Sequence, residues 1–149
     1  MINELNLIRA LTTDLHLPEP AVQWLVSLYN AAQVFDDVAD NGQILRHNLN
    51  RAIWDTLVAM PQNEFFLQHG AYLLPVLGVN IIKWQTADIE ERNGRVNAKT
   101  YMWRAGFFDI VLQVVQLCHG VDSAMHLAPM VLKMYAEEFN DYLKEFIHA

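Results

Sequence analysis

The spacing of apolar residues constrains the fold of this chain more than any other feature of its sequence. Apolar side chains recur three and four positions apart along nearly the whole chain. That is the period of an α-helix with one buried face. No segment shows the alternation of apolar and polar residues that is typical of a half-buried strand. The sequence therefore predicts an all-α protein.

Prolines, glycines and asparagine–glycine pairs divide this pattern into six predicted helices. They cover residues 2–15, 20–40, 49–60, 63–91, 97–119 and 122 or 123 onward. Pro75 is expected to bend the fourth helix, and Gly106 inside the fifth indicates a close approach by a neighbouring helix. Because the connections are short and no linker or repeat is present, we expect a single domain, residues 1–149, folded as a compact bundle.

The charge balance of the chain limits its partners. Seventeen acidic and ten basic residues give a formal net charge of -7, which repels phosphate backbones and anionic surfaces. We therefore expect no nucleic-acid partner and no membrane partner. The longest uncharged apolar stretch, residues 72–82, is shorter than the ~20 residues that cross a bilayer. The amino terminus lacks the features of a signal peptide, and the single Cys118 allows no intramolecular disulfide. These features predict a soluble, cytoplasmic protein.

A second copy of the chain is the protein partner that the composition favours. Hydrophobic residues make up 53% of the sequence, and a bundle of 149 residues with this much apolar surface leaves a helix face uncovered. We therefore expect a helix-mediated homo-oligomer.

Two short acidic segments carry the chemistry that the sequence permits. The first acidic segment contains Asp36, Asp37 and Asp40, and the second contains Glu137, Glu138 and Asp141. On a helix, this spacing brings the first and fifth side chains onto one face. Clustered carboxylate oxygens are ligands for a hard divalent cation. If the two segments faced each other across a bundle, they would form a magnesium and diphosphate site.

The surroundings of the first acidic segment leave two interpretations open. Asp36 and Asp40 lie at the edge of a predicted apolar stripe that includes Ala32, Phe35 and Ala39, so their carboxylates would look into a cleft. Three acids near a helix carboxyl end also repel one another and oppose the helix dipole, and a bound cation relieves both penalties. The alternative is a solvated helix end before the Asn41–Gly42 turn.

The first acidic segment, followed by Arg46 and His47, resembles the first aspartate-rich motif of the trans-prenyltransferases, the isoprenoid diphosphate synthases. Further fragments come in the order of that family. Gln85 and Asp88 resemble its Q-x-x-D motif, Lys99 and Thr100 resemble its K-T pair, and the second acidic segment falls where the second aspartate-rich motif belongs. His47 stands where the family has a second arginine, and glutamates open the second segment.

The resemblance implies a reduced terpenoid-synthase-like fold and a division of labour among these residues. The two acidic segments would hold magnesium ions, and Arg46, Gln85, Asp88 and Lys99 would contact a diphosphate ligand. Family members are about twice as long, so the resemblance supports ancestry better than catalysis, and whether the chain is an enzyme stays open. The alternative function is a non-enzymatic helical interaction or assembly protein without a metal site.

Other polar residues favour simpler interpretations. No two of the six histidines are four residues apart, so the sequence predicts no helical zinc site. Glu90, Glu91, Arg92 and Arg95 surround the Asn93–Gly94 turn and are predicted to form a solvated loop.

Overall fold

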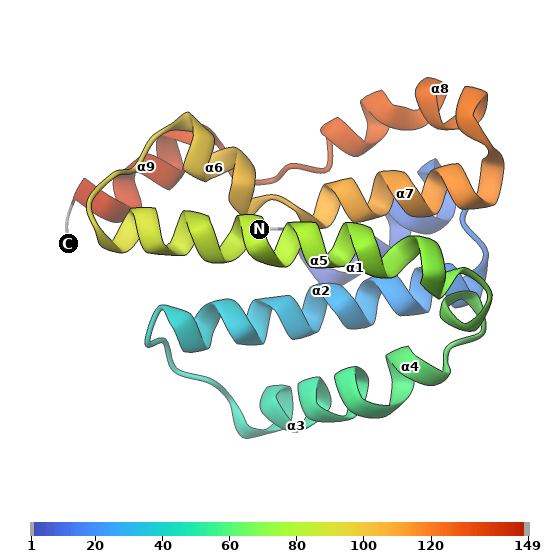
Figure 1. Ribbon diagram of the computed structural model, residues 1–149, viewed down its shortest axis with the longest axis horizontal. Coiled ribbons are helices and arrows are strands. Elements are labelled where there is room, and N and C mark those ends of the chain that lie inside the picture. Colours follow the sequence, from blue (N-terminus) through green and yellow to red (C-terminus); the bar gives the residue numbers. More distant parts are fainter. Residues whose placement is uncertain (1, 148–149) are drawn as a thin grey trace. The chain divides into compact units, whose positions relative to one another are not determined.

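The computed structural model describes residues 2–147 and is helical through most of them (Figure 1). No strand occurs among these residues, which confirms the all-α class. The described chain forms eight continuous helical runs, so the expected number of six is wrong. The labelled elements are α1 (Glu4–Arg9), the π-helical η1 (Ala10–Asp14), α2 (Glu19–Ala39), α3 (Arg46–Trp54), the π-helical η2 (Asp55–Ala59), α4 (Met60–Gln62), α5 (Glu64–Arg92), α6 (Ala98–Arg104), α7 (Phe107–His119), α8 (Val121–Leu132) and α9 (Phe139–Ile147).

The chain divides into two compact units. Unit 1 contains residues 2–6 and 71–147, and unit 2 is Leu7–Gly70. Helix α5 begins in unit 2 and continues into unit 1.

Unit 2 is built around an antiparallel pair formed by α2 and the continuous helix of α3, η2 and α4 (Figure 1). Pro18 caps the start of α2, and Asn41, with a positive φ of 57°, ends it, as the sequence predicts. Ala31 and Val34 of α2 pack against Ala52 of α3. We refer to α2, α3 and η2 together as the hairpin.

The inward face of α2 differs from the predicted stripe near its carboxyl end. Ala32 and Phe35 were expected to face the core, but both are exposed, and Phe35 has 51% of its surface accessible. Ala31 and Val34 occupy the buried positions instead. The apolar pattern runs almost all the way round this part of the helix, so only the position of α3 decides which side is covered.

In unit 1, the predicted fifth helix is interrupted at Ala105 and Gly106, which separate α6 from α7. The expected close approach at Gly106 is confirmed. A Cβ atom built on Gly106 would lie 2.3 Å from Oδ1 of Asn80 on α5 and 2.9 Å from its Cβ. Asn80 therefore occupies the space that any larger residue at position 106 would need.

The predicted sixth helix is two helices, α8 and α9, with residues 133–138 between them. Tertiary contacts hold this connection. The ring of Tyr135 stacks on Phe108 of α7 with centroids 4.1 Å apart, and the hydroxyl of Tyr101 on α6 donates a hydrogen bond to the carbonyl of Glu137. These contacts draw the connection onto α6 and α7, which a continuous helix could not follow.

Helix α5 is a continuous run of 29 residues that includes Pro75. In the described part of the chain, it is the one helix whose length and composition would allow it to cross a membrane; 17% of its most apolar 18-residue window is buried. The apolar stretch 72–82, which by itself is shorter than a membrane span, is therefore part of a longer apolar helix.

Candidate functional site

The first acidic segment lies at the carboxyl end of α2 in unit 2. Asp36 and Asp37 belong to the last turn of the helix, and Asp40 is its C-cap residue. Asp36 is half-buried, whereas Asp37 and Asp40 are exposed. Arg46, also exposed, is the first residue of α3 in the same unit. The predicted placement of these aspartates at a helix end is confirmed.

The second acidic segment lies at the start of α9 in unit 1. Glu137 and Glu138 precede the helix, and only Asp141 lies within it, so the expected single helix face is wrong for this segment. Asp141 forms an ion pair with Lys144, with 3.6 Å between Oδ1 and Nζ. Acidic residues before and within a first turn are favourable to the helix dipole. This segment therefore has a structural explanation that requires no ligand.

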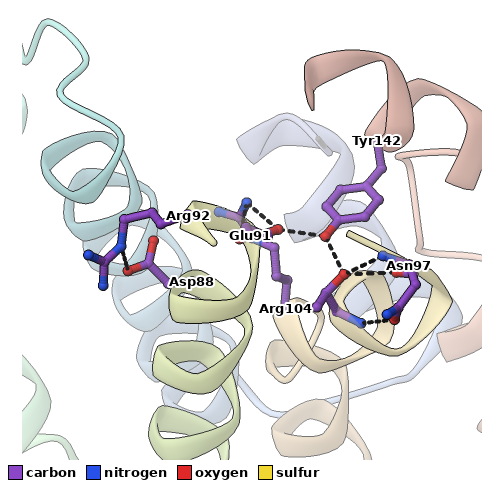
Figure 2. Close-up of polar contacts among 7 residues, drawn as sticks. Asp88, Glu91, Arg92, Asn97, Arg104 and Tyr142 are labelled. Atoms are coloured by element: carbon purple, nitrogen blue, oxygen red, sulfur yellow. Dashed lines mark hydrogen bonds and ion pairs between the residues drawn. The ribbon is translucent and has the colours of Figure 1, made fainter. Parts of the chain in front are cut away.

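The other predicted ligand-binding residues are also in unit 1. Asp88 is partly buried and forms an ion pair with Arg92, with 3.1 Å between Oδ2 and Nε (Figure 2). Gln85 is exposed on α5, and Lys99 is exposed in the first turn of α6. The Lys99 backbone N–H donates to Oδ1 of Asn97, which caps α6.

Side chains able to bind a metal ion are scattered through residues 2–147. In this range, no group of three or more His, Cys, Asp or Glu side chains lies close enough together to hold a metal ion. In particular, neither acidic segment gathers its own three carboxylates around one point. The two acidic segments belong to different units.

A buried polar network occupies the end of α5 in unit 1 (Figure 2). The Glu91 side chain is 8% exposed and accepts hydrogen bonds from Nη1 of Arg104 at 3.2 and 3.1 Å. The Tyr142 hydroxyl of α9 lies 2.6 Å from Oε2 of Glu91 and 2.7 Å from Oγ1 of Thr100. Asn97 and Thr100 complete the network as a reciprocal cap of α6. The network thus joins α5, α6 and α9.

This network corrects the expectation of a solvated loop for Glu91. A signal for its burial is present in the sequence, because Glu91 continues the inward positions of α5, Leu73, Asn80 and Ala87, at helical spacing. Glu90 and Arg95 do form an exposed ion pair, which lowers the pKa of the Glu90 carboxyl through the Arg95 hydrogen bond. Burial, followed by the hydrogen bond to Glu91, raises the pKa of Tyr142. A neutral phenol held between a paired carboxylate and a threonine is suited to joining helices rather than to proton transfer.

A hollow of about 520 Å³ lies in unit 2 near the beginnings of α2 and α5. Its lining residues are Glu19, Pro20, Gln23, Trp24, Ser27, Ala59, Met60, Gln62, Asn63 and Glu64. None of the predicted site residues is among them. Glu19 and Glu64 are first-turn acids of their helices, so their presence is explained by the helix dipoles.

The surface of unit 2 carries a row of exposed apolar side chains that the sequence pattern did not predict. Four residues recur at intervals of four from the N-cap of α3 through η2 and make up what we call the α3 row. Their exposed fractions are 61% for Leu45, 37% for Leu49, 49% for Ile53 and 73% for Leu57. A neighbouring side of the same helix packs on α2 through Ala52. The α3 row is therefore a regular apolar ridge that no element of unit 2 covers.

A scan against protein-family models and searches of curated proteins and of solved structures found no match to this chain.

Proposed function

We propose that this chain is a non-enzymatic helical protein that assembles with further copies of itself through exposed apolar helix surfaces. The observation that carries the proposal is the α3 row, whose four large side chains are between 37% and 73% exposed. Single exposed apolar residues are ordinary on protein surfaces, but a contiguous ridge marks an interaction surface.

Other described helices add to the exposed apolar surface. On α5, Leu74, Val79 and Ile82 are 53%, 57% and 64% exposed, and on α8, Met125 and Leu132 are 71% and 67% exposed. Apolar surface removed from water contributes about 25 cal/mol per Å². Association that covers this surface is therefore favourable.

The arrangement of polar groups supports assembly better than catalysis. The carboxylates of each acidic segment do not converge within the described residues. The most organised polar cluster, around Glu91 and Tyr142, is buried and internally paired. Catalytic groups need an accessible reacting position next to them.

Sedimentation velocity over a wide range of protein concentrations tests this function. We expect the weight-average sedimentation coefficient to rise with concentration and to fall again on dilution, as in reversible self-association. A chain that sediments as a monomer at every concentration would contradict the proposal.

A second candidate function is binding of Mg²⁺ and a small diphosphate, in a fold reduced from that of the prenyltransferases. Three aspartates at the carboxyl end of α2 favour it, because they oppose the helix dipole and Arg46 begins the next helix of the same unit. In this function, Asp36, Asp37 and Asp40 hold the metal and Arg46 contacts the diphosphate, all within unit 2.

Thermal melting with Mg²⁺ and an unreactive allylic diphosphate tests the second candidate. Ligand at 100 times its dissociation constant adds about 2.7 kcal/mol to the free energy of unfolding, so the melting temperature should rise. Asp36→Asn should abolish the rise, whereas Asp14→Asn, at an exposed aspartate in η1 of the same unit, should preserve it. An equal rise in both variants would exclude the first acidic segment as the site.

A further inference from the structure

We propose that the hairpin binds the same hairpin of a second copy, and that the contact surface is the α3 row together with Phe35 of α2. This inference rests on the proposed function and names its surface and partner. We call these five side chains the hairpin face. All of them belong to unit 2 and are large, apolar and at least 37% exposed.

Helix geometry places Phe35 and the two central residues of the α3 row, Leu49 and Ile53, on the same side of the hairpin. At about 100° per residue, Phe35 lies roughly 70° round α2 from the midpoint of Ala31 and Val34, which face α3. Leu49 and Ile53 lie roughly 60° and 100° round α3 from Ala52, in the same rotational sense. Because the two helices are antiparallel (Figure 1), rotation in the same sense leads to the same side.

The area of the hairpin face is sufficient for a specific but weak dimer. A large apolar side chain that is about half exposed presents on the order of 100 Å². Five such side chains would bury roughly 500 Å² on each copy, or about 1,000 Å² in the pair, which is near the smallest total buried area of specific protein interfaces. A reversible dimer is the expected outcome.

A second copy suits this surface in both shape and charge. The α3 row follows the four-residue ridge of a helix, and ridges of this kind interdigitate with helices of the same class. Asp36 follows Phe35 on the outer edge of α2, and Arg46 follows Leu45 on the outer edge of α3. A two-fold axis parallel to the hairpin lays α2 of one copy over α3 of the other. That arrangement brings the acidic edge of each copy to the basic edge of its partner, which a neutral helix would not do.

Two leucines in unit 2 provide a matched test. Leu57 is in the hairpin face and 73% exposed, and Leu67 is on α5, outside it, and 69% exposed. We expect Leu57→Glu to raise the dimer dissociation constant at least about tenfold, because the interface would bury an unpaired carboxylate. Leu67→Glu adds the same charge and should leave the constant within about twofold, a bound typical of exposed sites. Both constants are measured by sedimentation equilibrium.

Charge exchange tests the symmetry of the pair. Arg46→Asp should weaken the dimer, and adding Asp36→Arg to the same chain should recover most of the loss, since the two edges would again be opposite in charge. Circular dichroism must show native helicity in every variant, and Ile53→Gln serves as a milder second change in the hairpin face.

The outcomes separate this inference from the proposed function. If the native chain dimerises and neither Leu57→Glu nor Ile53→Gln weakens the dimer, the hairpin face is not the contact surface and self-assembly uses another one. If the native chain does not associate at any concentration, both the inference and the proposed function are wrong.

Discussion

Gly106 shows how one residue fixes the path of the chain in unit 1. Its backbone has an ordinary φ of -62°, so glycine is not required there for conformational freedom. The requirement is space, because Asn80 is buried and its side chain occupies the position of a Cβ atom. Asn80 is itself held by a hydrogen bond from Nδ2 to the carbonyl of Val76, at 3.0 Å.

Replacing Gly106 by alanine should therefore destabilise the protein. We expect Gly106→Ala to lower the free energy of unfolding by about 1–3 kcal/mol, since overpacking forces helices apart. The matched control is Gly78→Ala on α5, where an added Cβ would meet no atom within 4 Å. That change should raise stability by about 0.5–1 kcal/mol through the better helix propensity of alanine. Urea denaturation of both variants gives the comparison, and equal signs for the two changes would contradict the packing argument.

Tyr142 is the residue through which α9 joins the buried network. Tyr142→Phe removes the hydroxyl that lies between Glu91 and Thr100 and leaves a buried carboxylate oxygen with one donor fewer. We expect a loss of about 1–3 kcal/mol in the free energy of unfolding. Tyr72→Phe, at a tyrosine that is 62% exposed, should change stability by less than about 0.5 kcal/mol. A similar small change in Tyr142→Phe would show that the network contributes little.

At the scale of elements, the tyrosines of unit 1 attach the α8–α9 connection and α9 to α6 and α7. Tyr101 contacts the rings of Phe139 and Tyr142, and Tyr135 stacks on Phe108. Burial is the main cause that raises the pKa of Tyr101, Tyr135 and Tyr142 above the ordinary value of 10.0. The attachment of these elements therefore depends on neutral phenols.

The raised pKa values of these three tyrosines predict that the protein loses stability in alkali. The unfolded chain releases these phenolic protons near pH 10, before the folded chain does, so it binds fewer protons there. The contribution of these tyrosines to the free energy of unfolding is fully present below pH 10. It is lost as the pH rises through their raised pKa values in the folded chain. Urea midpoints measured from pH 9 to 12 should fall, and fall less steeply in Tyr142→Phe. Identical slopes in the two proteins would contradict this account.

The sequence predicted elements well where local signals decide them. The bounds of α2 follow from Pro18 and Pro20 at one end and Asn41–Gly42 at the other, and the structure agrees. The predicted helix after residue 122 was wrong because no proline or glycine marks its interruption at 133–138. The contacts of Tyr135 and Glu137 with α6 and α7 cause that break, and they connect residues far apart in the chain.

At the scale of the whole molecule, helix α5 and the net charge determine how the protein should behave toward lipid. One side of α5 is engaged in polar contacts, since Lys83 lies 3.1 Å from Asp109 of α7 and Asn80 is buried. A bilayer would require these polar groups to enter hydrocarbon. The net charge of -7 also repels anionic headgroups.

We therefore expect the protein to stay in the aqueous fraction in vesicle flotation, both with neutral phosphatidylcholine vesicles and with vesicles that contain anionic phosphatidylserine. This outcome would agree with the proposed cytoplasmic location. Flotation with neutral vesicles that is lost in Val79→Lys, a change at an exposed apolar residue of α5, would instead assign this helix to lipid.

For the candidate sites, some features could be predicted from the sequence and others required the tertiary structure. The sequence located the first acidic segment at a helix end, because Asn41–Gly42 is a local stop signal. It placed the second acidic segment on one helix face, which the start of α9 at Phe139 corrects. The α3 row was not predicted, because a helix pattern indicates which residues are apolar but not which of them a neighbour covers.

The sequence by itself determined the all-α class, the bounds of α2, the charge of the surface and the need for space at Gly106. Each of these depends on residues close together in the chain or on simple composition. The tertiary structure decided the burial of Glu91, the break between α8 and α9, and the exposure of Phe35 and the α3 row. Those features depend on which helices meet, because packing between distant segments selects one face from several that are equally apolar.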